Sequence, residues 1–91
     1  MNRPRRFRLA DDVLAQTALD EAVLLDARVG RYFAANVVAT TILRALCAGD
    51  DEAAMLEILS AQFDQDESVL RTDLARCLDD WIARGLIVEQ R

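Results

Sequence analysis

The chain has 91 residues, of which 53% are hydrophobic and 30% are charged, a balance typical of one folded domain with a charged surface. A domain of this size buries about two thirds of its unfolded surface, which leaves little room for a deep catalytic cavity. The sequence contains no histidine, the commonest general base and metal ligand. We therefore expect a non-catalytic protein without a metal site or a cofactor.

Charge is distributed unevenly along the chain. Four of the eleven basic residues lie before residue 9, whereas all sixteen acidic residues follow it. An acidic body repels phosphate backbones, so nucleic acid is not an expected partner. We expect residues 1–8 to form a basic, flexible tail and residues 9–91 to form the single domain.

We expect neither a membrane segment nor an export signal in this sequence. No stretch approaches the roughly 20 apolar residues of a membrane span, and Asp11 and Asp12 interrupt the apolar run that an export signal requires. Cys47 and Cys77 lack the close spacing of metal sites or disulfide scaffolds. We expect a cytoplasmic protein whose two thiols are reduced and packed in the core.

Three short strands are predicted before residue 36. Residues 13–20 alternate between two faces, which is typical of a half-buried strand. Two β-favouring runs, residues 22–25 and 32–34, flank a turn in which Asp26 suits the first position and Gly30 supplies a positive φ. The last two strands therefore form a hairpin within a three-stranded antiparallel meander.

Two helices are predicted in the middle of the chain. Asn36 precedes residues 37–46, where the apolar period becomes that of a helix, and its side chain can accept hydrogen bonds from the first helical turn. Gly49 is suited to ending this helix. A second helix begins at residues 50–52, and its apolar stripe consists of Met55, Leu56, Leu59 and Phe63.

A third helix is predicted from residues 66–67 to Gly85, with a short extended segment at residues 86–88. Its broad apolar face contains Val69, Leu70, Leu74, Cys77, Leu78 and Trp81. The predicted fold class is α+β and winged-helix-like: a three-stranded antiparallel sheet, three helices and a short C-terminal wing.

This order of elements also suggests a DNA-binding winged helix, with the third helix in the major groove. On that helix, however, Arg71, Arg76 and Arg84 are offset by four acidic residues, so no continuous phosphate-binding face is visible. A winged-helix transcriptional regulator is the alternative function. A cysteine-dependent enzyme is a third possibility, which the absence of an activating histidine disfavours.

The sequence resembles the PqqD-like family over about residues 8–89. The resemblance is carried by AVLLD at residues 22–26, GRYF at residues 30–33, Asn36, ILRAL at residues 42–46, and the ending L-x-x-C-L-x-x-W-x-x-x-G-L-I at residues 74–87. Family members are small winged-helix proteins known as RiPP recognition elements. They act as peptide chaperones that bind the leader segment of a ribosomally synthesised precursor peptide and present it to modifying enzymes. The resemblance therefore implies a non-catalytic adaptor of natural product biosynthesis.

The resemblance also implies how the leader binds: it is added as a strand beside the third strand and lies against the third helix. The implied leader-binding residues are Val29, Gly30, Arg31, Tyr32, Phe33, Ala34, Asp73, Arg76, Cys77 and Asp80. Asp73 and Asp80 are expected to pair with basic or polar leader groups, while Tyr32, Phe33 and Cys77 line an apolar pocket. Each charged residue of the helix is equally consistent with a solvated surface.

The implied partners are the precursor leader peptide and an enzyme that acts on it. A separate one-domain chain fits lasso-peptide systems, where the enzyme is a leader peptidase, and we prefer this assignment. It also fits pathways that use a radical SAM or other modifying enzyme. Because an open edge strand can pair with its own copy, we expect a monomer or a weak homodimer.

Overall fold

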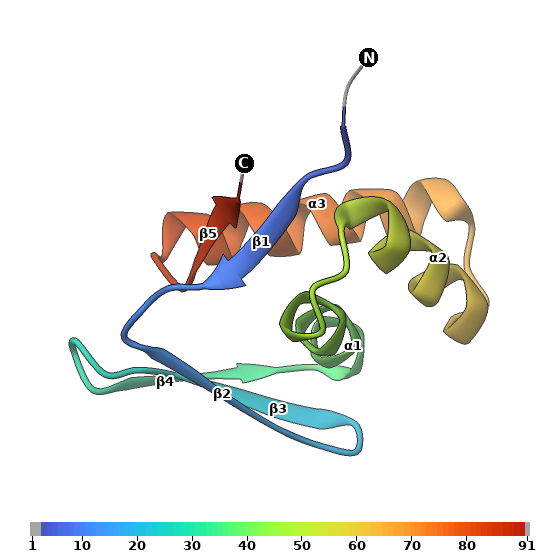
Figure 1. Cartoon of the computed structure of the whole chain (residues 1–91). Coiled ribbons are helices and arrows are strands. Elements are labelled where there is room, and N and C mark those ends of the chain that lie inside the picture. Colours follow the sequence, from blue (N-terminus) through green and yellow to red (C-terminus); the bar gives the residue numbers. More distant parts are fainter. Residues whose placement is uncertain (1–2, 91) are drawn as a thin grey trace.

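The computed structural model of the protein describes residues 3–90. The elements are β1 (Arg6–Leu9), β2 (Val13–Ala18), β3 (Glu21–Asp26), β4 (Arg31–Ala35), α1 (Val37–Cys47), α2 (Glu52–Gln62), α3 (Glu67–Ala83) and β5 (Ile87–Gln90). Strands β2, β3 and β4 form one antiparallel sheet in that order, and β1 pairs with β5 in a separate two-stranded ribbon (Figure 1). The prediction of a winged-helix-like α+β fold is confirmed.

The N-terminal segment differs from the predicted flexible tail. Strand β1 pairs antiparallel with β5, and Phe7 is buried in the core. Arg5 forms an ion pair with Glu52 of α2 at 3.0 Å, and its guanidinium lies 5.2 Å from the ring centroid of Phe7. The prediction of a tail is therefore wrong for residues 5–8. Residues 3 and 4 are exposed and belong to no strand, while residues 1 and 2 lie outside the described residues. The predicted wing exists as β5, but it is held by a partner strand.

The β3–β4 hairpin forms as predicted. Its register runs from the pair Asp26–Arg31 beside the turn to the pair Ala22–Ala35 at the other end. Gly30 has a φ of 68°, a left-handed conformation that glycine adopts without a steric penalty. The first predicted strand is β2, which pairs with β3 and completes the meander.

A buried carboxylate holds the hairpin turn against the end of α3. Asp26 is only 5% exposed and accepts hydrogen bonds from Nε and Nη2 of Arg28, each at 2.9 Å. Nη2 of Arg28 also donates to the carbonyl oxygen of Gly85 at 2.9 Å. The guanidinium lowers the pKa of the Asp26 carboxyl, chiefly through the hydrogen bonds that it donates. One arginine thus links the hairpin to the helical layer.

Side chains cap the N-terminal ends of the first two helices, as predicted. Oδ1 of Asn36 accepts a hydrogen bond from the N–H of Ala39 at 2.8 Å, which caps α1 beside the end of β4. Oδ1 of Asp51 accepts from the N–H of Ala54 at 2.9 Å and caps α2 in the same way. The direction in which α1 leaves the sheet is therefore determined locally.

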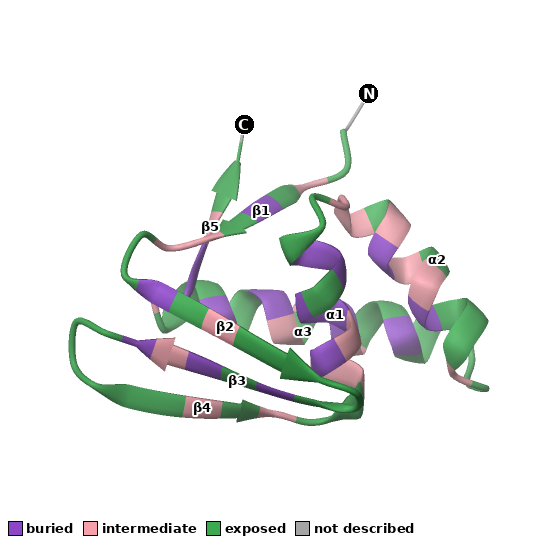
Figure 2. Ribbon diagram, turned by 60° about the horizontal axis from the view of Figure 1, so that its bottom comes forward, coloured by how far each residue is buried: buried purple, intermediate pink, exposed green. Residues whose placement is uncertain are grey.

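The core lies between the inner face of the three-stranded sheet and the helices (Figure 2). Its apolar members come from all three helices and both sheets: Phe7, Val13, Ala22, Leu24, Ile42, Leu43, Ala45, Leu46, Met55, Leu59, Leu70, Leu74, Leu78, Trp81, Leu86 and Ile87. The predicted core positions of α3 are confirmed at Leu70, Leu74, Leu78 and Trp81.

Two residues predicted to be in the core are exposed. Val69 is 46% exposed because it shares the outer face of α3 with the exposed Thr72, three residues later. Cys47 is exposed as well, since it is the last residue of α1 and lies on the same side as the exposed Arg44. The prediction that Cys47 is a core thiol is wrong.

Candidate functional site

Strand β4 is an edge of its sheet. Its one neighbour among residues 3–90 is β3, so alternate N–H and C=O groups along its other side have no strand partner. The predicted site residues Arg31, Tyr32, Phe33 and Ala34 all lie on this strand. Val29 and Gly30 lie in the exposed turn that precedes it. This edge provides backbone groups to which an extended peptide can bind.

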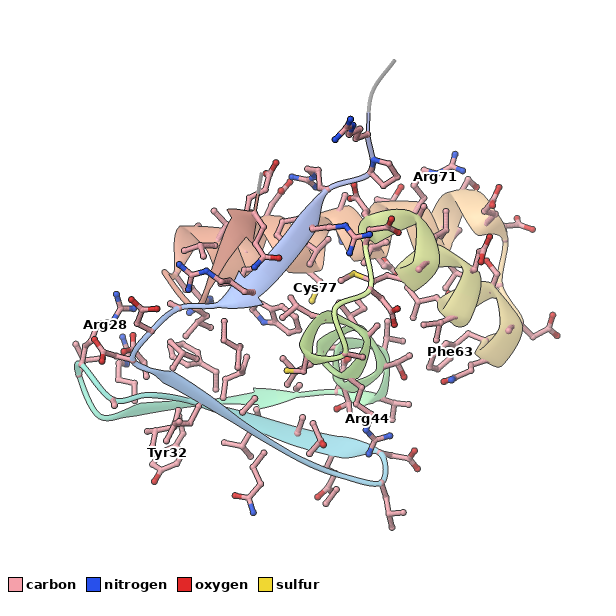
Figure 3. The ribbon with its side chains drawn as sticks, viewed as in Figure 1. Arg28, Tyr32, Arg44, Phe63, Arg71 and Cys77 are labelled. Carbon is pink, nitrogen blue, oxygen red and sulfur yellow. The ribbon has the colours of Figure 1, made fainter. Side chains whose placement is uncertain are left out.

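The two faces of β4 have different surroundings. Phe33 is paired with the buried Leu24 and faces the helices, whereas Tyr32 is paired with Leu25 and is 71% exposed. Figure 3 shows the Tyr32 side chain pointing away from the helical layer in which Cys77 lies. The predicted apolar pocket of Tyr32, Phe33 and Cys77 does not form as one site, because Cys77 lines a hollow between α1 and α3, whereas Tyr32 and Phe33 line another hollow at the β4 edge.

Tyr32 belongs instead to an apolar row on the outer face of the sheet. Leu14 is paired with Leu25, which is paired with Tyr32, so these side chains lie side by side across the three strands. Leu14 is 63% exposed and Val23, on the next row, is 39% exposed. This outer apolar face borders the β4 edge and was not predicted from the sequence.

A hollow of about 450 Å³ lies between the first turns of α1 and the middle of α3. Its lining residues are Asn36, Val38, Ala39, Ile42, Asp73, Arg76, Cys77 and Asp80. The structure thus brings together all four predicted residues of α3. The residues of α1 were not predicted as site residues, although the i, i+4 spacing of Val38 and Ile42 beside the cap at Asn36 is a signal that could have suggested them.

A second hollow of about 300 Å³ lies at the β4 edge and is lined by Tyr32, Phe33, Ala34, Asp80, Trp81 and Arg84. The guanidinium of Arg84 lies 5.3 Å from the ring centroid of Phe33, and its Nε donates to Oδ2 of Asp80 at 3.0 Å. Arg31 approaches the same ring at 5.9 Å. Because Asp80 lines both hollows, they are neighbours along α3, and we call the two together the β4–α3 groove.

Cys77 contributes an apolar wall to this groove. Burial raises the pKa of its thiol to about 12, and the nearby charge of Asp80 acts in the same direction. The thiol is therefore protonated at neutral pH and is a poor nucleophile. The Cys77 side chain is therefore suited to packing against a ligand and not to reacting with it.

Neither a metal site nor a membrane-spanning helix is found among residues 3–90. Across residues 3–90, no three side chains of the metal-binding types lie close enough together to hold an ion. No helix in the same part of the chain has the length and apolar character needed to cross a membrane.

Comparisons with known proteins place the fold in a family. The family model described as coenzyme PQQ synthesis protein D (PqqD) matches residues 21–87. A solved structure of TbiB1 in complex with the TbiA(beta) leader peptide has a TM-score of 0.82 and 25% sequence identity, and the match covers 88% of this chain and 93% of that one. A lasso peptide synthetase B1 complexed with the leader peptide also has a TM-score of 0.82, at 24% identity, covering 91% of this chain and 98% of the other. A comparison with curated protein sequences found no match. Since the family model spans most of the chain, this protein belongs to the PqqD family.

Proposed function

We propose that this protein is a RiPP recognition element, a non-catalytic adaptor that binds the leader segment of a ribosomally synthesised precursor peptide and presents it to an enzyme. The observation that carries the proposal is the free edge of β4, which runs beside the β4–α3 groove. The two solved relatives with the same fold are described as complexes with leader peptides. In this mode the leader adds a fourth strand to the sheet, beyond β4.

Backbone and side chains contribute differently to such binding. The edge of β4, from Arg31 to Ala34, has backbone groups that can form hydrogen bonds with any extended peptide. The turn at Val29 and Gly30 lies at one end of this edge. The groove selects the sequence because it combines apolar walls with charged rims. Phe33, Ile42 and Cys77 provide the walls.

The charged rims of the groove lie on α3. Asp73 and Asp80 are placed to pair with basic or polar groups of the leader, and Arg76 lies between them. None of the ion pairs within residues 3–90 involves Asp73 or Arg76, so both side chains are available to a ligand. These contacts select among leaders, while the strand pairing provides the common part of the affinity.

The pathway that we propose is of the lasso-peptide type, since one of the two structural relatives is described as a lasso peptide synthetase B1. The enzyme partner is then a leader peptidase, and a radical SAM or other modifying enzyme is the alternative. Precursor peptides are made on ribosomes, so we place the adaptor in the cytoplasm. The neighbouring open reading frames test the assignment: a short precursor gene beside a protease gene supports it, and a radical SAM gene in that place contradicts it.

The proposed strand addition is tested with leader peptides that are N-methylated at one backbone position at a time. N-methylation removes a donor but leaves the side chain unchanged. Fluorescence polarisation with the labelled leader of the neighbouring precursor gene should show saturable binding. Methylation should weaken that binding at every second position, where the N–H points toward β4, and should have little effect between them. Equal effects at all positions, or no binding of the unmodified leader, would contradict strand addition.

The structure does not favour the alternative of a DNA-binding regulator. On α3, Arg71 is paired with Glu67 at 3.4 Å and Arg84 with Asp80 at 3.0 Å. At the N-terminal ribbon, Arg5 is held by Glu52. These carboxylates reduce the positive potential that phosphate binding requires. A gel shift of duplex DNA at low protein concentration that weakens with salt would revive this alternative.

A further inference from the structure

We infer that the leader recognised by this protein carries an acidic side chain that binds between Arg31 and Arg84, four residues after the side chain that fills the hollow between α1 and α3. This inference rests on the proposed function and specifies its peptide. It concerns the charge and the direction of the leader in the β4–α3 groove.

Two guanidinium groups from different elements lie near one aromatic ring at one end of the groove. Arg31, at the start of β4, and Arg84, at the C-terminal end of α3, approach the Phe33 ring at 5.9 Å and 5.3 Å. Phe33 and Arg84 line the hollow at the free strand edge, and Arg31 is the first residue of that strand. Arginine is well suited to such a place, because its planar fork binds a carboxylate while its face stacks on an aromatic side chain.

The nearby carboxylates do not neutralise both arginines at this end of the groove. Asp26 is paired in register with Arg31, but its oxygens accept hydrogen bonds from Arg28. Asp80 forms an ion pair with Nε of Arg84, which leaves the remaining N–H groups of that guanidinium for another acceptor. No ion pair involving Arg31 occurs in the part of the chain that the structure describes. Two guanidiniums therefore face one carboxylate here, and a leader carboxylate would balance them.

The other end of the groove has a different character. Its hollow is bounded by Val38, Ala39 and Ile42 of α1 and by Cys77 of α3, and it is rimmed by two carboxylates with Arg76 between them. Such a site favours an apolar side chain, or one with an apolar stem and a basic or polar tip. Since Asp80 is already paired with Arg84, the charges of Asp73 and Arg76 offset each other at this end. The groove is thus apolar with polar rims beside α1 and basic beside the hairpin turn.

The register of an added strand determines how many leader residues separate the apolar end of the groove from its basic end. The inward-facing positions of β4 are Arg31, Phe33 and Ala35, and Ala35 is followed by Asn36, which lines the larger hollow. All pairings in the sheet are antiparallel, and antiparallel addition is slightly the more stable arrangement per residue. A leader in that direction places one residue opposite Ala35 in the hollow, and the residue four positions later opposite Arg31 beside Arg84.

The experiment is a charge scan of the labelled leader encoded beside this protein's gene, with each position replaced in turn by Glu or Lys. Affinities are measured by fluorescence polarisation for the wild-type protein and for the R31E and R84Q variants. One position should prefer Glu over Lys by about ten-fold for the wild-type protein. At that position R31E should reverse the preference, and R84Q should reduce it. A reversed preference at a single leader position requires direct pairing between that position and residue 31. A general loss of folding would lower the affinity for every peptide and would not reverse the preference.

Two controls make the result specific. R71E introduces the same charge change on α3 next to Glu67, away from the groove, and it should leave the preference intact. A39L fills the larger hollow, and its effect should be coupled to the leader residue four positions before the acidic one. Coupling to the residue four positions after it would indicate a parallel leader and would overturn the inference.

The binding experiment distinguishes a wrong charge assignment from a wrong proposed function. If the leader binds wild-type protein but no position shows a preference that depends on Arg31 and Arg84, the charge assignment is wrong while the adaptor function stands. An equal loss of preference in R71E also overturns it, because the effect would then come from net charge. If the unmodified leader does not bind at all, the proposed function fails first.

Discussion

Replacing Phe7 by Ala tests whether the N-terminal segment is part of the fold. The ring is 2% exposed and packs in the core, and the Arg5 guanidinium lies 5.2 Å from its centroid. Removing a buried phenylalanine side chain costs about 3–5 kcal/mol of the free energy of unfolding. For a domain of this size, such a loss lowers the Tm by at least about 12 °C. It also removes a large share of the 5–15 kcal/mol that typically stabilises a domain.

Urea denaturation followed by circular dichroism measures this loss, and R8A on the same strand provides a matched control because Arg8 is exposed. We expect R8A to change the free energy of unfolding by no more than about 0.5 kcal/mol. We expect F7A to lower the midpoint without a change in the m-value. Leader affinity of the folded F7A protein should be unchanged, since Phe7 does not line the β4–α3 groove. A change as small as that of R8A would mean that the segment is a tail after all.

Three other predictions concern the site and its support. F33A should weaken leader binding by roughly ten-fold in fluorescence polarisation, because the Phe33 ring faces the helices and contacts two arginines. Y32A should change the affinity by less than about three-fold, because Tyr32 borders the same hollow but is 71% exposed; the reverse order would contradict the assignment of the two faces. Because its arginine partner lowers the pKa of Asp26, this carboxylate stabilises the fold above its unfolded pKa and loses that contribution as the pH falls through its folded value. D26N should therefore be less stable than wild type at pH 7, and the gap should narrow toward pH 3 in urea titrations; a constant gap would refute this. Iodoacetamide at neutral pH should label the exposed Cys47 before Cys77, as read by mass spectrometry, because burial raises the pKa of the Cys77 thiol to about 12; faster labelling of Cys77 would contradict its role as an apolar wall.

The sequence was informative wherever a structural choice depends on neighbouring residues. Gly30 in the turn and Asn36 before α1 act over a few positions, and the hairpin and the helix start were predicted from them. Strand β1 was missed because it pairs with β5, more than seventy residues away, and has only one fully buried side chain. The four arginines around Phe7 suggested a solvated tail, because the acidic groups that form ion pairs with Arg5 are distant in the sequence and come from α2, α3 and β5.

The candidate site was predictable on one side only. Helical spacing placed Asp73, Cys77 and Asp80 on one stripe of α3, and the structure brings these residues to one hollow. The opposite wall comes from α1, to which no role in the site was assigned and whose position depends on tertiary packing. The strand was misjudged in one respect: Tyr32, Phe33 and Cys77 were assigned to one pocket, although Cys77 lines the hollow between α1 and α3, whereas the two strand residues line the hollow at the β4 edge.

The β1–β5 ribbon also determines how this domain can be connected to other proteins. Because β1 pairs with β5, with Arg6 opposite Gln90, both ends of the described chain leave from this ribbon, on the side of the molecule away from the β3–β4 hairpin (Figures 1 and 2). A fluorophore, a surface linker or a fused enzyme attached at either end would therefore leave the β4 edge accessible. The domain can be tethered from one side while it captures a peptide on the other, which makes it a convenient module for joining a chosen leader to a chosen enzyme.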